Sequence, residues 1–216
     1  MDANKHHLPV SRTATYYTLG KLGENTRRVW FVLHGYGQLA QQFIKKFGVL
    51  DDGQTLVVAP EALSRFYLEN GFEHIGASWM TREERELEID DYVSYLDQLY
   101  QTIMSGGNME NIEITLLGFS QGSATACRWL DRGMISCDRL ILWAGHFANG
   151  LTDLVSLDKL PKTNSYFVYG EQDQFLSKIN VQEYMVRLNV EAPDLQIIRY
   201  QGGHAINEHV LKTHFL

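Results

Sequence analysis

Short apolar stretches recur along the chain, and glycine, proline or polar residues bound each of them. Runs rich in β-branched and aromatic residues predict strands, and near-continuous apolar runs predict strands that are buried on both faces. The predicted strands are residues 13–19, 27–33, 55–59, 112–117, 139–144, 165–169 and 195–200. The apolar pattern therefore indicates a protein built around a sheet of about seven strands.

Segments with helical spacing lie between the predicted strands. Apolar residues from Ile89 to Ile103 recur at intervals of three and one, which places one apolar stripe on a long helix. The sequence T-R-E-E at residues 81–84 has the spacing of a capping box, and the glycine pair at 106–107 is expected to end this helix. The other predicted helices are residues 39–47, 121–132, 181–188 and 205–215. Residues 61–80 show no clear period and predict a long loop.

Strands that alternate with helices predict a mostly parallel sheet with helices on both faces. The chain has 216 residues, which is typical of one α/β domain, so we expect residues 1–216 to form a single domain. Residues 147–164 are too few to form a large cap between two of the strands. In such sheets ligands bind at the carboxyl ends of the strands, so the residues directly after each strand are the candidates for a functional site.

Composition narrows the class of protein. The formal net charge is -7 and there is no basic run, which argues against nucleic acid or an anionic membrane surface as a partner. No stretch approaches the ~18 apolar residues of a membrane span, and the first residues lack a signal-peptide pattern. Two cysteines, Cys127 and Cys137, are too few for a disulfide framework and predict buried packing. We therefore expect a cytoplasmic protein, whose oligomeric state is open, with a homodimer among the options.

The sequence G-F-S-Q-G at residues 118–122 lies between a predicted strand and a predicted helix of small residues. A serine between two glycines at such a sharp turn has the arrangement of a nucleophile elbow. Side chains at positions 118 and 122 would collide with neighbouring elements, and Ser120 would adopt a strained backbone that exposes its hydroxyl. Ser120 is therefore the candidate nucleophile. The alternative is an ordinary glycine-bounded turn between a strand and a helix.

A serine hydroxyl is a poor nucleophile until a base accepts its proton. The histidines that follow predicted strands are His34, His146 and His204. His204 comes after the last strand and two glycines, where a loop can place its ring over Ser120. Asp173, four residues after a strand, can orient the base and stabilise the imidazolium. The order Ser120, Asp173, His204 along the chain is the order of nucleophile, acid and base expected where the serine lies in a nucleophile elbow. Glu171 remains an alternative acid, and His146 a weaker alternative base.

The tetrahedral oxyanion of acyl transfer requires hydrogen-bond donors that are already in place. One candidate is the backbone N–H of Gln121, directly after the nucleophile, and the other is the N–H of Tyr36 in the sequence L-H-G-Y-G at residues 33–37. Aromatic residues near these loops predict an apolar acyl site. The residues assigned to a substrate pocket are Tyr36, Phe66, Trp79, His146 and Phe147. The alternative for each aromatic residue is plain packing over the edge of the sheet.

Together these motifs resemble the α/β-hydrolase superfamily, and more narrowly the phospholipase/carboxylesterase group of serine esterases that includes the acyl-protein thioesterases. The resemblance rests on L-H-G-Y-G, G-F-S-Q-G, Trp79 before an acidic helix, Y-G-E-Q-D and G-G-H, which together span residues 33–204. It implies an α/β-hydrolase fold with little or no lid and hydrolysis without a cofactor. By the same resemblance, Ser120, Asp173 and His204 would form the catalytic triad.

The sequence thus predicts a serine hydrolase that cleaves carboxylic esters, or thioesters, with small or short-to-medium acyl groups through an acyl-enzyme. We expect no cofactor and no metal site, because there is no H-E-x-x-H motif or cluster of histidines and carboxylates. An amidase or peptidase remains an alternative, as does a non-catalytic protein that binds a small ligand. The natural ester is open, because residues 80–81, Ser123 and residues 145–149 depart from the usual pattern of the group.

Overall fold

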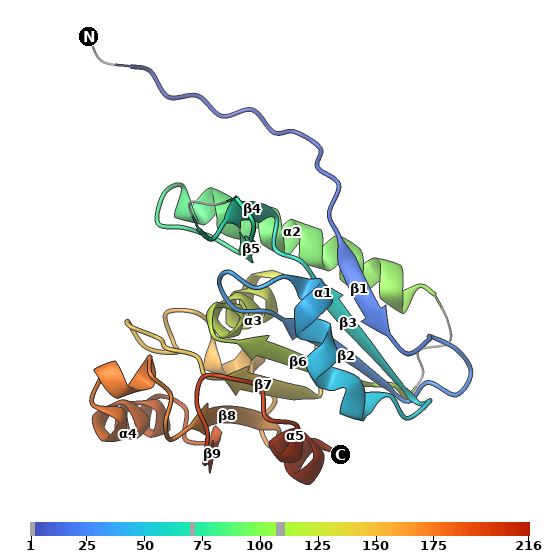
Figure 1. Ribbon diagram of the computed structural model, residues 1–216, viewed down its shortest axis with the longest axis vertical. Coiled ribbons are helices and arrows are strands. Elements are labelled where there is room, and N and C mark those ends of the chain that lie inside the picture. The colour runs from blue at the N-terminus through green and yellow to red at the C-terminus, as the bar shows by residue number, and fades with distance from the viewer. Residues whose placement is uncertain (1–2, 70–71, 107–110) are drawn as a thin grey trace.

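A twisted sheet of seven strands forms the centre of the protein, and helices cover both of its faces (Figure 1). The computed structural model describes residues 3–69, 72–106 and 111–216. The strands are β1 (Tyr16–Leu19), β2 (Arg28–Leu33), β3 (Thr55–Pro60), β6 (Glu113–Phe119), β7 (Arg139–Trp143), β8 (Ser165–Gly170) and β9 (Gln196–Tyr200). Their order across the sheet is β1-β3-β2-β6-β7-β8-β9, and each neighbouring pair is parallel except β1 and β3. The predicted mostly parallel sheet is confirmed.

Alternate side chains of each central strand enter different cores, because successive residues of a strand point to opposite faces. The helices are α1 (Ala40–Phe43), α2 (Arg85–Met104), α3 (Gln121–Arg132), α4 (Val181–Glu191) and α5 (Glu208–Phe215), and the 3-10 helices are η1 (Ile44–Leu50), η2 (Leu157–Lys159) and η3 (Leu176–Lys178). Val29 and Phe31 of β2 belong to the core that includes residues of α2, α3 and α4, whereas Trp30 and Val32 belong to the core that includes residues of α1, η1 and α5. Both faces of the central strands are therefore buried, as their continuous apolar sequence predicts.

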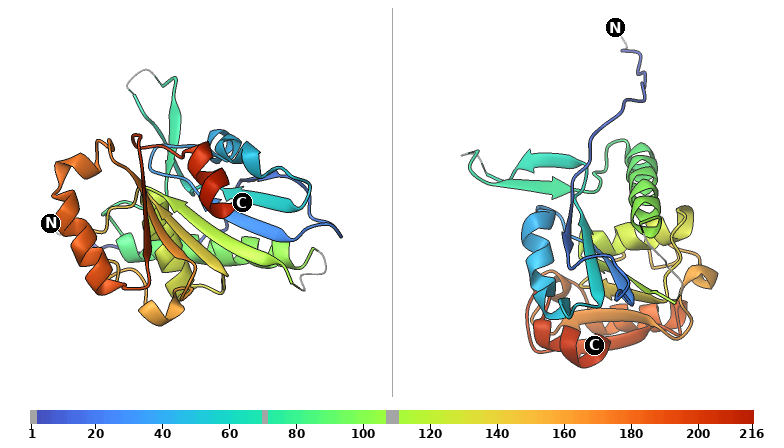
Figure 2. Two further views of the ribbon diagram at one scale, coloured as in Figure 1. Left: turned by 90° about the horizontal axis from the view of Figure 1, so that it is seen from below. Right: turned by 90° about the vertical axis from the view of Figure 1, so that its right-hand side faces the viewer.

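Residues 61–80 are not the long loop that their irregular sequence predicted. They contain a second, two-stranded antiparallel sheet formed by β4 (Ser64–Tyr67) and β5 (Ile75–Ser78). This hairpin stands out from the body of the protein (Figure 2). In β4, half-buried and exposed side chains alternate, and four residues are too short a run for this period to be evident in the sequence.

The predicted helix ends were less accurate than the predicted strands. Residues 39–47 divide into α1 and η1, and the last helix begins at Glu208 instead of Ala205. The predicted capping box between Thr81 and Glu84 does not form. Instead, the Thr81 N–H donates to the Glu88 carboxylate at 2.6 Å, and the Thr81 hydroxyl donates to the same carboxylate at 3.1 Å. Helix α2 ends at Met104, and Gly107 of the predicted stop signal lies outside the described residues.

The parallel strands bring the carboxyl ends of β2, β6, β7, β8 and β9 to the same edge of the sheet. Each candidate catalytic residue follows one of these ends. Between Trp143 and Ser165 the chain forms only one short 3-10 helix, η2, so this segment forms no large cap, as predicted. In the part of the chain that the structure describes, no helix is both long and apolar enough to cross a membrane.

Candidate active site

Ser120 lies at the turn between β6 and α3, and its backbone has the strained conformation that the sequence predicted. Its φ is 53° and its ψ is -116°. A Cβ atom at Gly118 would lie 2.2 Å from the carbonyl oxygen of Gly122, and one at Gly122 would lie 2.3 Å from that of Leu33. Both glycines are therefore required by contact with neighbouring backbone. The Ser120 N–H donates to the carbonyl of Trp143 at 2.8 Å, which holds the turn against β7.

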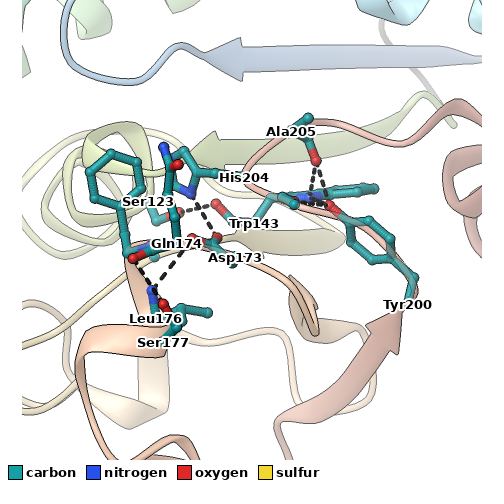
Figure 3. A network of polar contacts seen from close by, with 12 residues as sticks. Ser123, Trp143, Asp173, Gln174, Leu176, Ser177, Tyr200, His204 and Ala205 are labelled. Carbon is teal, nitrogen blue, oxygen red and sulfur yellow. Dashed lines mark hydrogen bonds and ion pairs between the residues drawn. The ribbon is translucent and has the colours of Figure 1, made fainter.

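Asp173 and His204 meet at the same edge of the sheet, from the loops after β8 and β9 (Figure 3). Nδ1 of His204 lies 2.7 Å from Oδ2 of Asp173, whose side chain is fully buried. The other oxygen, Oδ1, accepts the backbone N–H groups of Phe175 at 2.8 Å and Leu176 at 3.4 Å. Since the carboxylate accepts from Nδ1, the proton of a neutral His204 is on Nδ1 and Nε2 is free to accept another.

The imidazole of His204 contacts two phenylalanine rings. The centroid of Phe119, directly before the elbow serine, lies 4.8 Å from that of His204, and the centroid of Phe175 lies 4.6 Å away. Among the described residues, no hydrogen bond joins Ser120 Oγ to His204; contacts of this kind often tighten only when substrate is bound. Phe175 was not identified from the sequence. Its only signal was a large apolar residue two positions after the acid.

The loop that carries His204 is fixed by two aromatic side chains (Figure 3). The Tyr200 hydroxyl donates to the carbonyl of Ala205 at 2.5 Å, and the Trp143 indole N–H donates to the same oxygen at 3.1 Å. Burial raises the pKa of Tyr200, so its hydroxyl stays protonated and available as a donor. A Cβ at Gly170 would lie 2.2 Å from the carbonyl of Gly202, so the loops of the acid and the base are in direct backbone contact.

The loop after β2 packs directly against the elbow. A Cβ atom at Gly35 would lie 3.1 Å from Cβ of Ser120. Among the described residues, the N–H groups of Tyr36 and Gln121 donate to no protein acceptor. A developing oxyanion requires backbone N–H groups that are free to donate, and these two amides meet that requirement.

His34 of this loop is a buried structural residue and does not face Ser120 as a base. Its Nε2 accepts the backbone N–H of Ala62 at 3.1 Å, and its Nδ1 contacts the carbonyl of Gly35 at 2.8 Å. A backbone N–H can only donate, so the imidazole is neutral with its proton on Nδ1. Burial lowers the pKa of His34 below its ordinary value. The hydrogen bond to Gly35 and the negative charge of Glu61 raise the pKa, but their effect is smaller than that of burial.

The lowered pKa of His34 predicts a loss of stability in acid. Below the ordinary pKa of 6.5 the unfolded chain binds a proton that the folded chain does not. The free energy of unfolding therefore decreases as the pH is lowered, by up to about 1.4 kcal/mol per pH unit. Urea unfolding between about pH 8 and pH 5.5 measures this slope. His34→Gln should remove this contribution, whereas His209→Gln, at an exposed position, should retain it. An equal slope in both variants would contradict the prediction.

The residues predicted to form the pocket have different environments. Tyr36 is 60% exposed and its ring lies 5.0 Å from that of Phe66. Trp79 and Phe147 are each only 2% exposed, so they belong to the core and offer little surface to a ligand. His146 is exposed and lies 5.5 Å from the ring of Tyr184, with its pKa lowered by partial burial and by the charge of Arg187. Of the predicted pocket residues, Tyr36 and His146 are exposed and Phe66 is half-buried, and Tyr36 and Phe66 lie together at the loop after β2.

Comparison with known proteins agrees with the fold and identifies the family. The family model described as "Serine hydrolase (FSH1)" matches residues 25–209. This range covers most of the chain, which therefore belongs to that serine hydrolase family. A comparison with curated proteins found no match. The resemblance inferred from the motifs is confirmed, and the protein is a hydrolase with the α/β-hydrolase fold.

Several solved structures share this fold. Zea mays acyl-protein thioesterase 2 has a TM-score of 0.64 and 16% identity, over 93% of this chain and 95% of that chain. The esterase PE8 has a TM-score of 0.59 and 19% identity over 93% and 95% of the two chains. A phospholipase/carboxylesterase from Dyadobacter fermentans has a TM-score of 0.59 and 20% identity over 93% and 96%. At these identities the similarity concerns the fold alone.

Proposed function

We propose that this protein is a serine esterase in which Ser120 is the nucleophile, His204 the general base and Asp173 the residue that orients the base. The observation that carries the proposal is the 2.7 Å contact between His204 and a fully buried Asp173, next to a serine in a strained turn. Membership of a serine hydrolase family supports the same chemistry.

In the first half of the reaction, Nε2 of His204 accepts the proton of Ser120 while Oγ forms a bond to the carbonyl carbon of the ester. The electron pair of the carbonyl moves to its oxygen. When that pair returns, the bond to the alkoxy oxygen breaks, and the leaving alcohol takes the proton from His204. A water molecule then repeats the sequence on the acyl-enzyme and releases the carboxylic acid. The Asp173 carboxylate orients His204 and stabilises the imidazolium in both halves.

The oxyanion formed in each half would be stabilised by the backbone N–H groups of Tyr36 and Gln121. Both lack a protein acceptor in the described part of the chain, and contact between Gly35 and Ser120 places the first loop against the nucleophile. The N-terminus of α3 adds its partial positive charge beside Gln121. Removing a donor of this kind costs an enzyme about 100-fold to 1,000-fold in kcat.

The substrate class that we propose is a carboxylic ester, or thioester, with a short-to-medium acyl group. The rings of Tyr36 and Phe66 lie 5.0 Å apart at the loop after β2, and η2 is the only helical element between β7 and β8. Aromatic rings at this position would contact a short or medium acyl group next to the reacting carbonyl. A panel of p-nitrophenyl esters from acetate to palmitate tests the assignment, and a maximum of kcat/KM at palmitate would contradict it.

A fluorophosphonate probe tests the proposed chemistry directly, because it phosphonylates only an activated serine. The native protein should be labelled, and Ser120→Ala should not. A folded native protein that resists the probe would instead be a non-catalytic ligand-binding member of the fold. Comparing turnover of an ester with that of the matching amide distinguishes an esterase from an amidase.

Tyr200→Phe is expected to lower kcat about tenfold with little change in KM, since a loosened loop no longer holds His204 at the geometry of the transition state. Tyr95→Phe is the matched control, because it removes a tyrosine hydrogen bond of 3.0 Å to Thr15, away from the site. Steady-state kinetics and thermal melting should be measured on both variants. The assigned role would be wrong if the two variants lost stability alike and both kept native kcat.

A further inference from the structure

The end of the hairpin is connected to the loop that carries Tyr36. Residues 76–80, the bridge segment, run from within β5 to the turn before α2. The Gly37 N–H donates to the carbonyl of Ala77 at 2.9 Å, and the Ala77 N–H donates to the carbonyl of Gln38 at 3.2 Å. A Cβ atom at Gly76 would lie 2.6 Å from the carbonyl oxygen of Gly37, so the two backbones are in direct contact. The loop after β2, residues 34–38, is therefore attached to the bridge segment through its main chain.

The indole of Trp79 forms a second attachment to the same loop. Its N–H donates to the carbonyl of His34 at 2.8 Å, and its ring lies 5.1 Å from the imidazole of His34. Since Trp79 is only 2% exposed, water does not compete for this hydrogen bond. The carbonyl that it holds lies two residues before Tyr36. The position of Trp79 therefore affects the direction of the proposed oxyanion amide.

The carboxamide of Gln121 attaches the same segment to the nucleophile elbow. Its Oε1 accepts the N–H of Trp79 at 3.1 Å, and its Nε2 donates to the carbonyl of Met80 at 2.9 Å. The orientation of the carboxamide is fixed by these partners, because a backbone N–H can only donate and a carbonyl can only accept. The side chain is thus bound to the bridge segment, while the backbone N–H of the same residue is the second proposed oxyanion donor.

We propose that the side chains of Trp79 and Gln121 are positioning residues that fix, through the bridge segment, the separation of the two oxyanion amides. This inference rests on the proposed function. Neither side chain needs to touch the substrate. Two loops from different parts of the sequence must present their N–H groups to one oxygen atom, and a displacement of about 1 Å is enough to reduce a rate about 100-fold. A single short segment bonded to both loops removes that freedom.

Two variants test the proposal. Trp79→Phe keeps a buried aromatic ring and removes the indole N–H, whereas Gln121→Met keeps the length of the side chain and removes the carboxamide. Gln121 is half-buried, so its variant remains informative if Trp79→Phe does not fold. Trp129→Phe is the matched control. It removes a buried indole hydrogen bond of 2.8 Å to Asp97, where α3 packs on α2.

Three quantities are measured for each variant: kcat and KM on p-nitrophenyl acetate, the affinity for an arylboronic acid, and the thermal midpoint. The boronic acid is used because it forms a tetrahedral adduct on an activated serine. Trp79→Phe and Gln121→Met should each lower kcat about tenfold, keep KM within about twofold, and weaken boronic acid binding by the same factor as kcat. The double variant should lose little more than either single variant, because both break one connection. Trp129→Phe should lower the thermal midpoint and keep native kcat and boronic acid affinity.

Native kcat and native boronic acid affinity in both Trp79→Phe and Gln121→Met would overturn the proposal, and so would losses that multiply in the double variant. In either case the proposed function stands if the native chain is labelled by the fluorophosphonate at Ser120. A native chain that neither takes the label nor binds the boronic acid would refute the proposed function, and the positioning role with it.

Discussion

Ser120→Ala is expected to lower kcat on a p-nitrophenyl ester by roughly 10⁵-fold to 10⁶-fold, the loss typical of an enzyme deprived of its nucleophile. Without Oγ no acyl-enzyme can form, and only the oxyanion donors and substrate binding contribute to the remaining rate. KM should change little, because the serine makes its bond in the transition state. The measurement requires enzyme purified from a host in which contaminating esterases have been excluded.

Ser123→Ala provides the control for this experiment. Its hydroxyl is buried three residues further along the same helix, where it donates to the carbonyl of Gly118 at 2.7 Å. Its removal disturbs the interior of the turn but takes away no reacting group, so kcat should stay within about tenfold of native. Turnover by Ser120→Ala at a rate similar to that of Ser123→Ala would show that another group performs the reaction.

Asp173→Asn has the second largest expected effect, a loss of about 10⁴-fold in kcat. An asparagine fits the space and can donate its own N–H to Nδ1 of His204. The proton of the imidazole then moves to Nε2, which can no longer accept the proton of Ser120. The loss arises from the wrong tautomer, so the folded structure and KM should be preserved. Steady-state kinetics with a thermal melt of the same preparation separates the two effects.

Glu171→Gln tests the alternative acid that the sequence left open. Glu171 is exposed and its carboxylate lies 3.6 Å from Nε of Arg199, with no contact to His204 among the described residues. Its variant is expected to keep native kcat. If Glu171→Gln lost activity and Asp173→Asn kept it, the roles of the two carboxylates would have to be exchanged.

The parts of the structure that follow strict local rules could be predicted from the sequence. The strands came from runs such as residues 29–33, where every side chain is apolar and both faces are buried. The strained turn came from Gly118 and Gly122, because a Cβ at either position would overlap neighbouring backbone. The buried strands depend on residues that are close in sequence, and the turn depends on a steric limit that only glycine meets. Both features can therefore be recognised in a single amino-acid sequence.

Features that depend on how distant segments meet could not be predicted in the same way. Trp79 was predicted to line a pocket, yet it is buried with its indole directed at the carbonyl of His34. Tyr200 ended a predicted strand, and nothing in its neighbourhood indicated that its hydroxyl would hold the loop of His204. An aromatic residue in an irregular segment has no period from which its direction can be inferred. Only the tertiary structure determines whether such a ring faces solvent, core or backbone.

The base of the proposed triad follows one of the two edge strands of the sheet. His204 follows β9, which pairs with β8 on one side only and whose side chains are mostly half-buried or exposed. Edge strands with few buried contacts open at lower free energy than central ones. We therefore expect activity to disappear at a lower urea concentration than the far-ultraviolet circular dichroism signal. Loss of activity would then indicate that β9 has opened while the rest of the sheet is still folded. The enzyme would be active over a narrower range of urea concentrations than the range over which it is folded.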